Sequence, residues 1–147
     1  MIRPATPDDV PALMALEKHA ITAAHWSAEQ YQAVFSPNQI FRTALVIEDQ
    51  NAIQGFLIAR AVGPEWEVEN IAIAGPARRR GLGTRLLGEF LSAARSQGAT
   101  AVFLEVRESN SAARHLYEKW AFCESGRRAN YFHDPVEAAI VYRLDFS

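Results

Sequence analysis

The feature that most constrains the fold is a strand, a glycine-rich turn and an amphipathic helix that follow one another without a break. Residues 66–73 (WEVENIAI) predict a strand, and the turn at 75–84 contains three glycines and three consecutive arginines. From residue 83 to residue 98 the apolar residues recur at helical spacing, and 101–106 is a second strand-like run. A strand–helix–strand unit of this length predicts two parallel strands joined by a right-handed crossover.

The segments around this unit predict further helices and antiparallel strands. Three helix N-termini are predicted at Thr6, Ser27 and Asn110. Further strands are predicted at the N-terminus and at 43–47, 53–62, 122–128 and 138–145. A turn at 49–51 joins two of these runs as a hairpin. We therefore expect one domain of residues 1–147 in the α/β (α+β) class. Its sheet should be mixed, mostly antiparallel and twisted, with about seven strands and helices on both faces.

Composition excludes several classes of protein. The chain has 147 residues, 49% hydrophobic and 22% charged, and its single cysteine rules out a disulfide framework and a cysteine-based zinc site. The net charge of −2 does not favour broad binding to nucleic acid or to a membrane surface. Its apolar runs are far shorter than the ~20 residues of a membrane span, and the N-terminus lacks a signal-peptide pattern. We expect a cytoplasmic chain, a monomer or a homodimer, that binds no metal, since its four histidines lack ligand spacing.

The glycine-rich turn predicts an anion-binding site. A strand that runs through glycines directly into a helix presents unpaired backbone N–H groups and the positive helix end, which suits a pyrophosphate. The spacing does not match a Walker loop, and Leu86 stands where a dinucleotide fingerprint needs its third glycine. The alternative interpretation is a basic surface turn before an ordinary helix.

The motifs around this turn resemble those of one enzyme family. Arg78, Gly81 and Gly83 match the R/Q-x-x-G-x-G/A pattern of the GNAT superfamily of N-acetyltransferases. Residues 70–73 (NIAI), 104–110 (LEVRESN) and 116–122 (LYEKWAF) are similar to elements of its RimI branch, in the same order and over nearly the whole chain. Two departures are an alanine at 121 in place of glycine, and RANYF at 128–132 in place of R-R-N-Y-Y.

The resemblance implies the GNAT fold, acetyl-CoA as co-substrate and transfer of acetyl to the α-amino group of a protein N-terminus, such as that of a ribosomal protein. By the same resemblance, Glu105 is the general base and Tyr117 the general acid. The implied acetyl-CoA contacts are Ile71, Ala72, Ile73, Arg78, Arg79, Arg80, Gly81, Leu82, Gly83, Thr84 and Asn110. Trp26 and Tyr131 are the implied residues of the acceptor site.

Several of these residues also permit a plain structural role. Glu105 shares a strand face with Phe103, which predicts a partly desolvated carboxylate, but it could also be a strand end that reaches solvent beside an arginine. Tyr117 lies on the apolar face of its helix and by periodicity alone is a core tyrosine. Glu69 lies on an acidic strand face that either is solvated or steers a cationic amine.

The acceptor stays open. The loop at 133–136 is shorter than in close RimI sequences, so a small amine such as a polyamine or an antibiotic is an alternative acceptor to a protein N-terminus. A non-catalytic acyl-CoA-binding module is a third hypothesis, which the pair of Glu105 and Tyr117 argues against. Cys123 is expected to be a small buried residue. This argues against a mechanism in which the acetyl group is first transferred to Cys123.

Overall fold

The computed structural model describes residues 1–18, 26–38, 41–75 and 81–146. In chain order the elements are β1 (Ile2–Pro4), the 3-10 helix η1 (Pro7–Asp9), α1 (Val10–Lys18), α2 (Ala28–Ala33), β2 (Arg42–Asp49), β3 (Ala52–Val62), β4 (Glu65–Ile73), α3 (Leu82–Ser96), β5 (Ala101–Arg107), α4 (Ser111–Lys119), β6 (Cys123–Phe132) and β7 (Glu137–Asp145). The strands form one seven-stranded sheet in the order β1-β2-β3-β4-β5-β7-β6. This confirms the predicted mixed sheet, in which β4 and β5 pair in parallel and the other described neighbours pair antiparallel.

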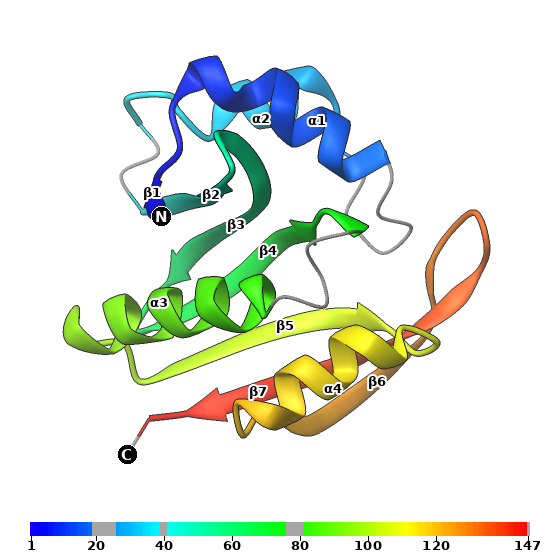
Figure 1. The fold of residues 1–147 in the computed structure, drawn as a ribbon. Helices are drawn as coiled ribbons and strands as arrows, with labels where there is room; N and C mark the ends of the chain where they lie inside the picture. Colours follow the sequence, from blue (N-terminus) through cyan, green and yellow to red (C-terminus); the bar gives the residue numbers. More distant parts are fainter. Residues whose placement is uncertain (19–25, 39–40, 76–80, 147) are drawn as a thin grey trace.

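Helices cover both faces of the sheet, as predicted. Figure 1 shows α1 and α2 on one side and α3 and α4 on the other. Alternation along β3 explains this: Phe56 and Ile58 pack with the α1/α2 side, while Leu57 and Ala59 pack with α3. The amphipathic α3 buries Leu86, Leu87, Phe90 and Leu91 against the same face of the sheet. Two separate apolar clusters therefore enclose the strands.

The parallel pair β4–β5 opens at one end. Its register runs from Glu65 and Ala101 to Val68 and Leu104, and both strands continue beyond that point without a shared register. Opposite β3, Ile58 pairs with Asn70 and Ala59 with Val68, so Glu69 is the extra residue of a β-bulge. The bulge bends β4 where the parallel ladder stops, and Figure 1 shows the two strands diverging there. The fold thus has a gap in the middle of its sheet.

One expectation about the core is wrong. Cys123 is exposed, because β6 is the edge strand and all its residues except Phe132 are exposed. The expectation of burial rested on Phe122 alone, whereas the residues that follow Cys123 are mostly polar, as in an exposed edge strand. In the described part of the chain no helix is long and apolar enough to cross a membrane.

Candidate active site

The gap between β4 and β5 is the mouth of a cavity of about 500 Å³. The C-terminal parts of both strands, the first turn of α3, one side of α4 along its length, and Phe132 of β6 line it. The sequence-predicted residues among its lining are Glu69, Ile71, Ala72, Ile73, Gly81, Gly83, Thr84, Glu105, Asn110 and Tyr117. The fold therefore brings together residues that lie up to 48 positions apart in the sequence, from β4, α3, β5 and α4.

The N-terminus of α3 faces this cavity through small residues. Gly81 caps the helix at φ +73°, in the left-handed region that glycine occupies without strain. Gly83 and Thr84 line the cavity, whereas the Leu82 side chain is buried in the core, so only its main chain can contact a ligand. Arg78, Arg79 and Arg80, the predicted cationic part of the turn, lie outside the described residues.

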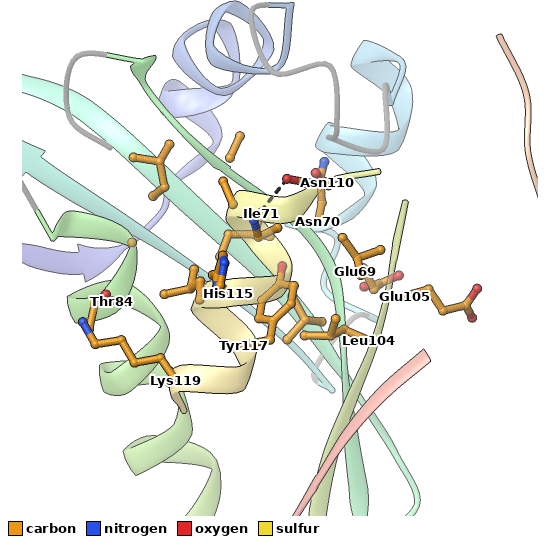
Figure 2. Close-up of a pocket in the computed structure, with 18 of the residues that line it drawn as sticks. Glu69, Asn70, Ile71, Thr84, Leu104, Glu105, Asn110, His115, Tyr117 and Lys119 are labelled. Carbon is orange, nitrogen blue, oxygen red and sulfur yellow. Dashed lines mark hydrogen bonds between the residues drawn. The ribbon is translucent and has the colours of Figure 1, made fainter. Parts of the chain in front are cut away.

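Asn110 occupies the corresponding position at the start of α4. Its side-chain oxygen accepts a hydrogen bond from the Ala113 N–H at 3.1 Å, which caps the helix (dashed line in Figure 2). This contact fixes the side chain at the edge of the cavity. Asn110 therefore has a structural role that is compatible with a contact to a ligand.

Glu105 projects from β5 on the face opposite to Leu104 and Val106, as strand alternation predicts. Its side chain is 15% exposed, and Oε1 lies 3.9 Å from the Arg128 Nε. Oε2 is buried and has no hydrogen-bond partner among the described residues. The carboxylate is thus partly desolvated, as one interpretation of the sequence predicted. An arginine lies beside it, as the other predicted, but the contact is too long for a hydrogen bond.

Tyr117 is a core tyrosine whose position also lines the cavity. It is 3% exposed and packs against the rings of Phe122 and Tyr142 at 5.8 and 6.0 Å. Burial raises the pKa of its hydroxyl above the ordinary value of 10.0, so the phenol stays protonated at neutral pH. Within the described residues the hydroxyl makes no hydrogen bond to a carbonyl, which the core interpretation would require.

Glu105 and Tyr117 lie on opposite sides of the sheet. Tyr117 belongs to the apolar cluster under α3 and α4, whereas Glu105 points to the side that carries α1 and α2. In Figure 2 the Glu105 side chain extends away from the Tyr117 ring. The open end of the β4–β5 pair connects the two faces, so a molecule in the gap reaches both groups.

Of the predicted acceptor residues, Glu69 lines the cavity, whereas Trp26 and Tyr131 do not and lie instead beside Arg42 and Glu105. Glu69 receives two hydrogen bonds from Arg42, from Nε at 3.1 Å and from Nη2 at 2.9 Å, and Arg42 lies 5.7 Å from the Trp26 ring centroid. Tyr131 is 43% exposed. Its pKa is raised by burial and by a hydrogen bond with Glu105.

Sequence reasoning missed Arg42 and Phe132. Phe132 lines the cavity, and its place in the RANYF stretch at 128–132 was the one indication available. No sequence pattern indicated Arg42, because its ion pair with Glu69 depends on the order of the strands in the sheet. The described residues contain no group of three His, Cys, Asp or Glu side chains placed to hold a metal ion.

Comparison with known proteins decides the family. A profile of the acetyltransferase (GNAT) family matches residues 11–122. This chain belongs to the GNAT family. Membership makes it an N-acetyltransferase and implies acetyl-CoA as its acetyl donor.

Two curated relatives of this GNAT chain have the same name, [ribosomal protein bS18]-alanine N-acetyltransferase. The protein of Escherichia coli K12 is 35% identical over 142 residues, which covers 95% of this chain and 93% of the relative. The protein of Haemophilus influenzae is 42% identical over 91 residues, and that match spans 62% of each chain.

Solved structures agree with the fold. The crystal structure of the ribosomal-protein-S18-alanine N-acetyltransferase from Escherichia coli has a TM-score of 0.87 at 29% identity, covering 100% of this chain and 94% of that one. Ard1 from Thermoplasma volcanium has a TM-score of 0.89 at 24% identity, covering 100% and 98%. The predicted GNAT fold and its RimI resemblance are thereby confirmed.

Proposed function

We propose that this GNAT enzyme transfers acetyl from acetyl-CoA to the α-amino group of a protein N-terminus, with the N-terminal alanine of ribosomal protein bS18 as its acceptor. The placement of Glu105 and Tyr117 on opposite sides of one gap carries this proposal. Acetyl transfer uses a base within reach of the attacking amine and an acid within reach of the leaving sulfur, and two substrates that enter the gap from its two sides would bring these atoms to Glu105 and Tyr117. The names of the relatives support the acceptor.

The residues of the gap fit acetyl-CoA. The start of α3, with Gly81 in the left-handed region, offers backbone N–H groups to the pyrophosphate, and the arginines at 78–80 add charge. Ile71, Ala72 and Ile73 hold the acetyl–pantetheine arm along β4, and Asn110 contacts it from α4. When bound, acetyl-CoA supplies the acetyl thioester.

On the acceptor face, Glu105 prepares the amine. An α-amino group has a pKa of about 8 and is largely protonated at neutral pH, so it cannot attack until a base takes its proton. The unpartnered Oε2 of Glu105 is available for that proton, directly or through a water. Trp26, Glu69 and Tyr131 line the approach of the acceptor.

On the other face, Tyr117 protonates the leaving group. Its hydroxyl is protonated at neutral pH because burial raises its pKa, and it delivers a proton to the departing thiolate sulfur. The acyl carbon–sulfur bond breaks as the carbon–nitrogen bond forms. In all, the ammonium nitrogen loses two protons, the sulfur gains one, and one is released to solvent.

The test measures CoA release with three acceptors: an alanine-initiated bS18 peptide, the same peptide with a blocked N-terminus, and spermidine. We expect turnover of the first acceptor alone. Glu105→Gln should lower kcat/KM for the peptide by about 10²–10⁴-fold, the range for general acid–base catalysis, and leave the KM for acetyl-CoA unchanged.

Glu65→Gln is the matched control, because Glu65 is a carboxylate of β4 outside the cavity, paired with Arg143. Its kcat/KM should stay near the wild-type value. An inert alanine peptide beside rapid turnover of spermidine would show that the acceptor is a small amine. A Glu105→Gln enzyme with wild-type kcat/KM would remove Glu105 from the mechanism.

A further inference from the structure

Charged side chains from neighbouring strands meet on the face of the sheet that bears Glu105. Arg42 of β2 and Arg60 of β3 lie in register with each other, and both reach carboxylates of β4. Two carboxylates on this face, Glu69 and Glu105, also line the cavity. These two acids differ in how completely an arginine neutralises them.

Glu69 is fully engaged. Arg42 binds both of its oxygens in a bidentate pair, and the two side chains are 19% and 12% exposed. Trp26 lies over the Arg42 guanidinium and shields the pair from one side. Arg60 is a poor substitute for Arg42, because it is half exposed, lies 3.9 Å from Glu69 and donates its hydrogen bond to Glu67. The negative charge of Glu69 is therefore cancelled mainly by Arg42.

Glu105 is the opposite case. Arg128, which is paired with it among the described residues, is 61% exposed, and their contact of 3.9 Å is too long for a hydrogen bond. Solvent screens an exposed pair of this length strongly. Among the described residues that line the cavity, the acceptor face therefore presents one effective negative charge, which matches the single positive charge of one α-ammonium group.

We propose that Arg42 is a specificity-determining residue, which neutralises Glu69 so that the acceptor face does not select for a second positive charge in the acceptor. This inference rests on the proposed function. Without Arg42, two carboxylates face the acceptor and attract a basic residue next to the reacting amine. Without Glu69, an unpaired arginine faces the acceptor and attracts an acidic residue there.

The test uses two peptides that differ at one position, with lysine or glutamate after the N-terminal alanine. The readout is the ratio of kcat/KM for the lysine peptide to kcat/KM for the glutamate peptide. A variant that loses activity equally with both peptides leaves this ratio unchanged. Arg42→Gln should raise this ratio about tenfold, the effect of one partly screened charge. Glu69→Gln should lower it several-fold.

Two further variants separate charge from structure. The double variant Arg42→Gln/Glu69→Gln should return the ratio to within about threefold of wild type, since both charges are then absent. Arg42→Lys keeps the charge and should also retain the wild-type ratio. Arg143→Gln is the matched control, because it removes an arginine paired with Glu65 on the same face but outside the cavity, and its ratio should equal that of wild type.

The outcomes distinguish this inference from the proposed function. If the wild type acetylates neither peptide, both proposals fail. If it acetylates both and Arg42→Gln leaves the ratio within twofold, or if the double variant keeps the shifted ratio, Arg42 does not set specificity through Glu69. Should Arg42→Gln fail to fold, Glu69→Gln alone decides, and an unchanged ratio in that variant overturns the inference.

Discussion

At the scale of single residues, one side chain belongs to the core and also has a part in the proposed reaction. The Tyr117 ring packs between two other aromatic rings, while its hydroxyl carries no hydrogen bond within the described residues. Tyr117 also lines the cavity, so its hydroxyl is placed to contact a ligand while its ring serves packing. Ring and hydroxyl can therefore be tested separately.

Tyr117→Phe removes the hydroxyl and keeps the ring. We expect kcat for peptide acetylation to fall by about 10²–10³-fold, within the range for a lost general acid. The KM for acetyl-CoA and the Tm should change little, because the packing of the ring is retained. Steady-state kinetics and thermal unfolding measure these quantities. Near-wild-type kcat at saturating substrates would exclude Tyr117 as the acid.

At the scale of elements, a buried polar cluster joins α1, α2 and β4. Tyr31 of α2 donates to the Glu17 carboxylate of α1 at 2.8 Å and accepts from the Asn70 side chain of β4 at 3.1 Å. Glu17 also accepts from the main-chain N–H of Trp26. Three elements that are far apart in the sequence thus share one network, directly beside the end of β4 that lines the cavity.

Tyr31→Phe should destabilise the fold through this network. It leaves the buried Glu17 one hydrogen bond short, and we expect the free energy of unfolding to fall by about 1–3 kcal/mol. Urea unfolding measures the change. Tyr131→Phe is the control: it removes a hydrogen bond with Glu105 at an exposed tyrosine of β6, where water can replace the hydroxyl, and should cost less than about 0.5 kcal/mol. Equal losses in the two variants would contradict the role of the cluster.

The elements were predicted well because their determinants are local. The capping boxes at Thr6 and Ser27 mark helix starts where the structure has them, and alternation put Glu105 on the correct face of β5. Cys123 was misassigned because its burial was inferred from Phe122 alone, whereas burial depends on what covers a strand, and the mostly polar residues that follow are those of an exposed edge strand.

At the scale of the whole molecule, an ion pair between Arg3 of β1 and Asp9 should make the stability of the fold depend on pH. Arg3 donates two hydrogen bonds to Asp9, at 2.8 and 3.0 Å, and these bonds lower the pKa of Asp9 from 3.8 to about 2. Because the pKa is lower in the folded chain than in the unfolded chain, the ionised form stabilises the fold above about pH 4. That contribution is lost as the pH falls towards 2.

Asp9→Asn should therefore reduce the free energy of unfolding by about 2 kcal/mol at pH 7. The difference between wild type and variant should shrink between pH 4 and pH 2, where the wild-type carboxylate takes up its proton. Urea unfolding at a series of pH values measures this. Asp8→Asn, at an exposed neighbouring carboxylate, is the control. A difference for Asp9→Asn that is independent of pH would contradict the assignment.

The sequence by itself determined the order of elements and the glycine-rich turn, and the resemblance of its motifs to the RimI branch named the candidate base and acid. The order of elements and the turn follow from residues that are neighbours along the chain. The tertiary structure alone decided that β4 and β5 part after Val68 and Leu104, and that Arg42 neutralises Glu69 from 27 positions away. The physical reason is that a charge pair or a gap depends on which strands become neighbours. Strand order is settled by packing of the whole sheet, which no local pattern records.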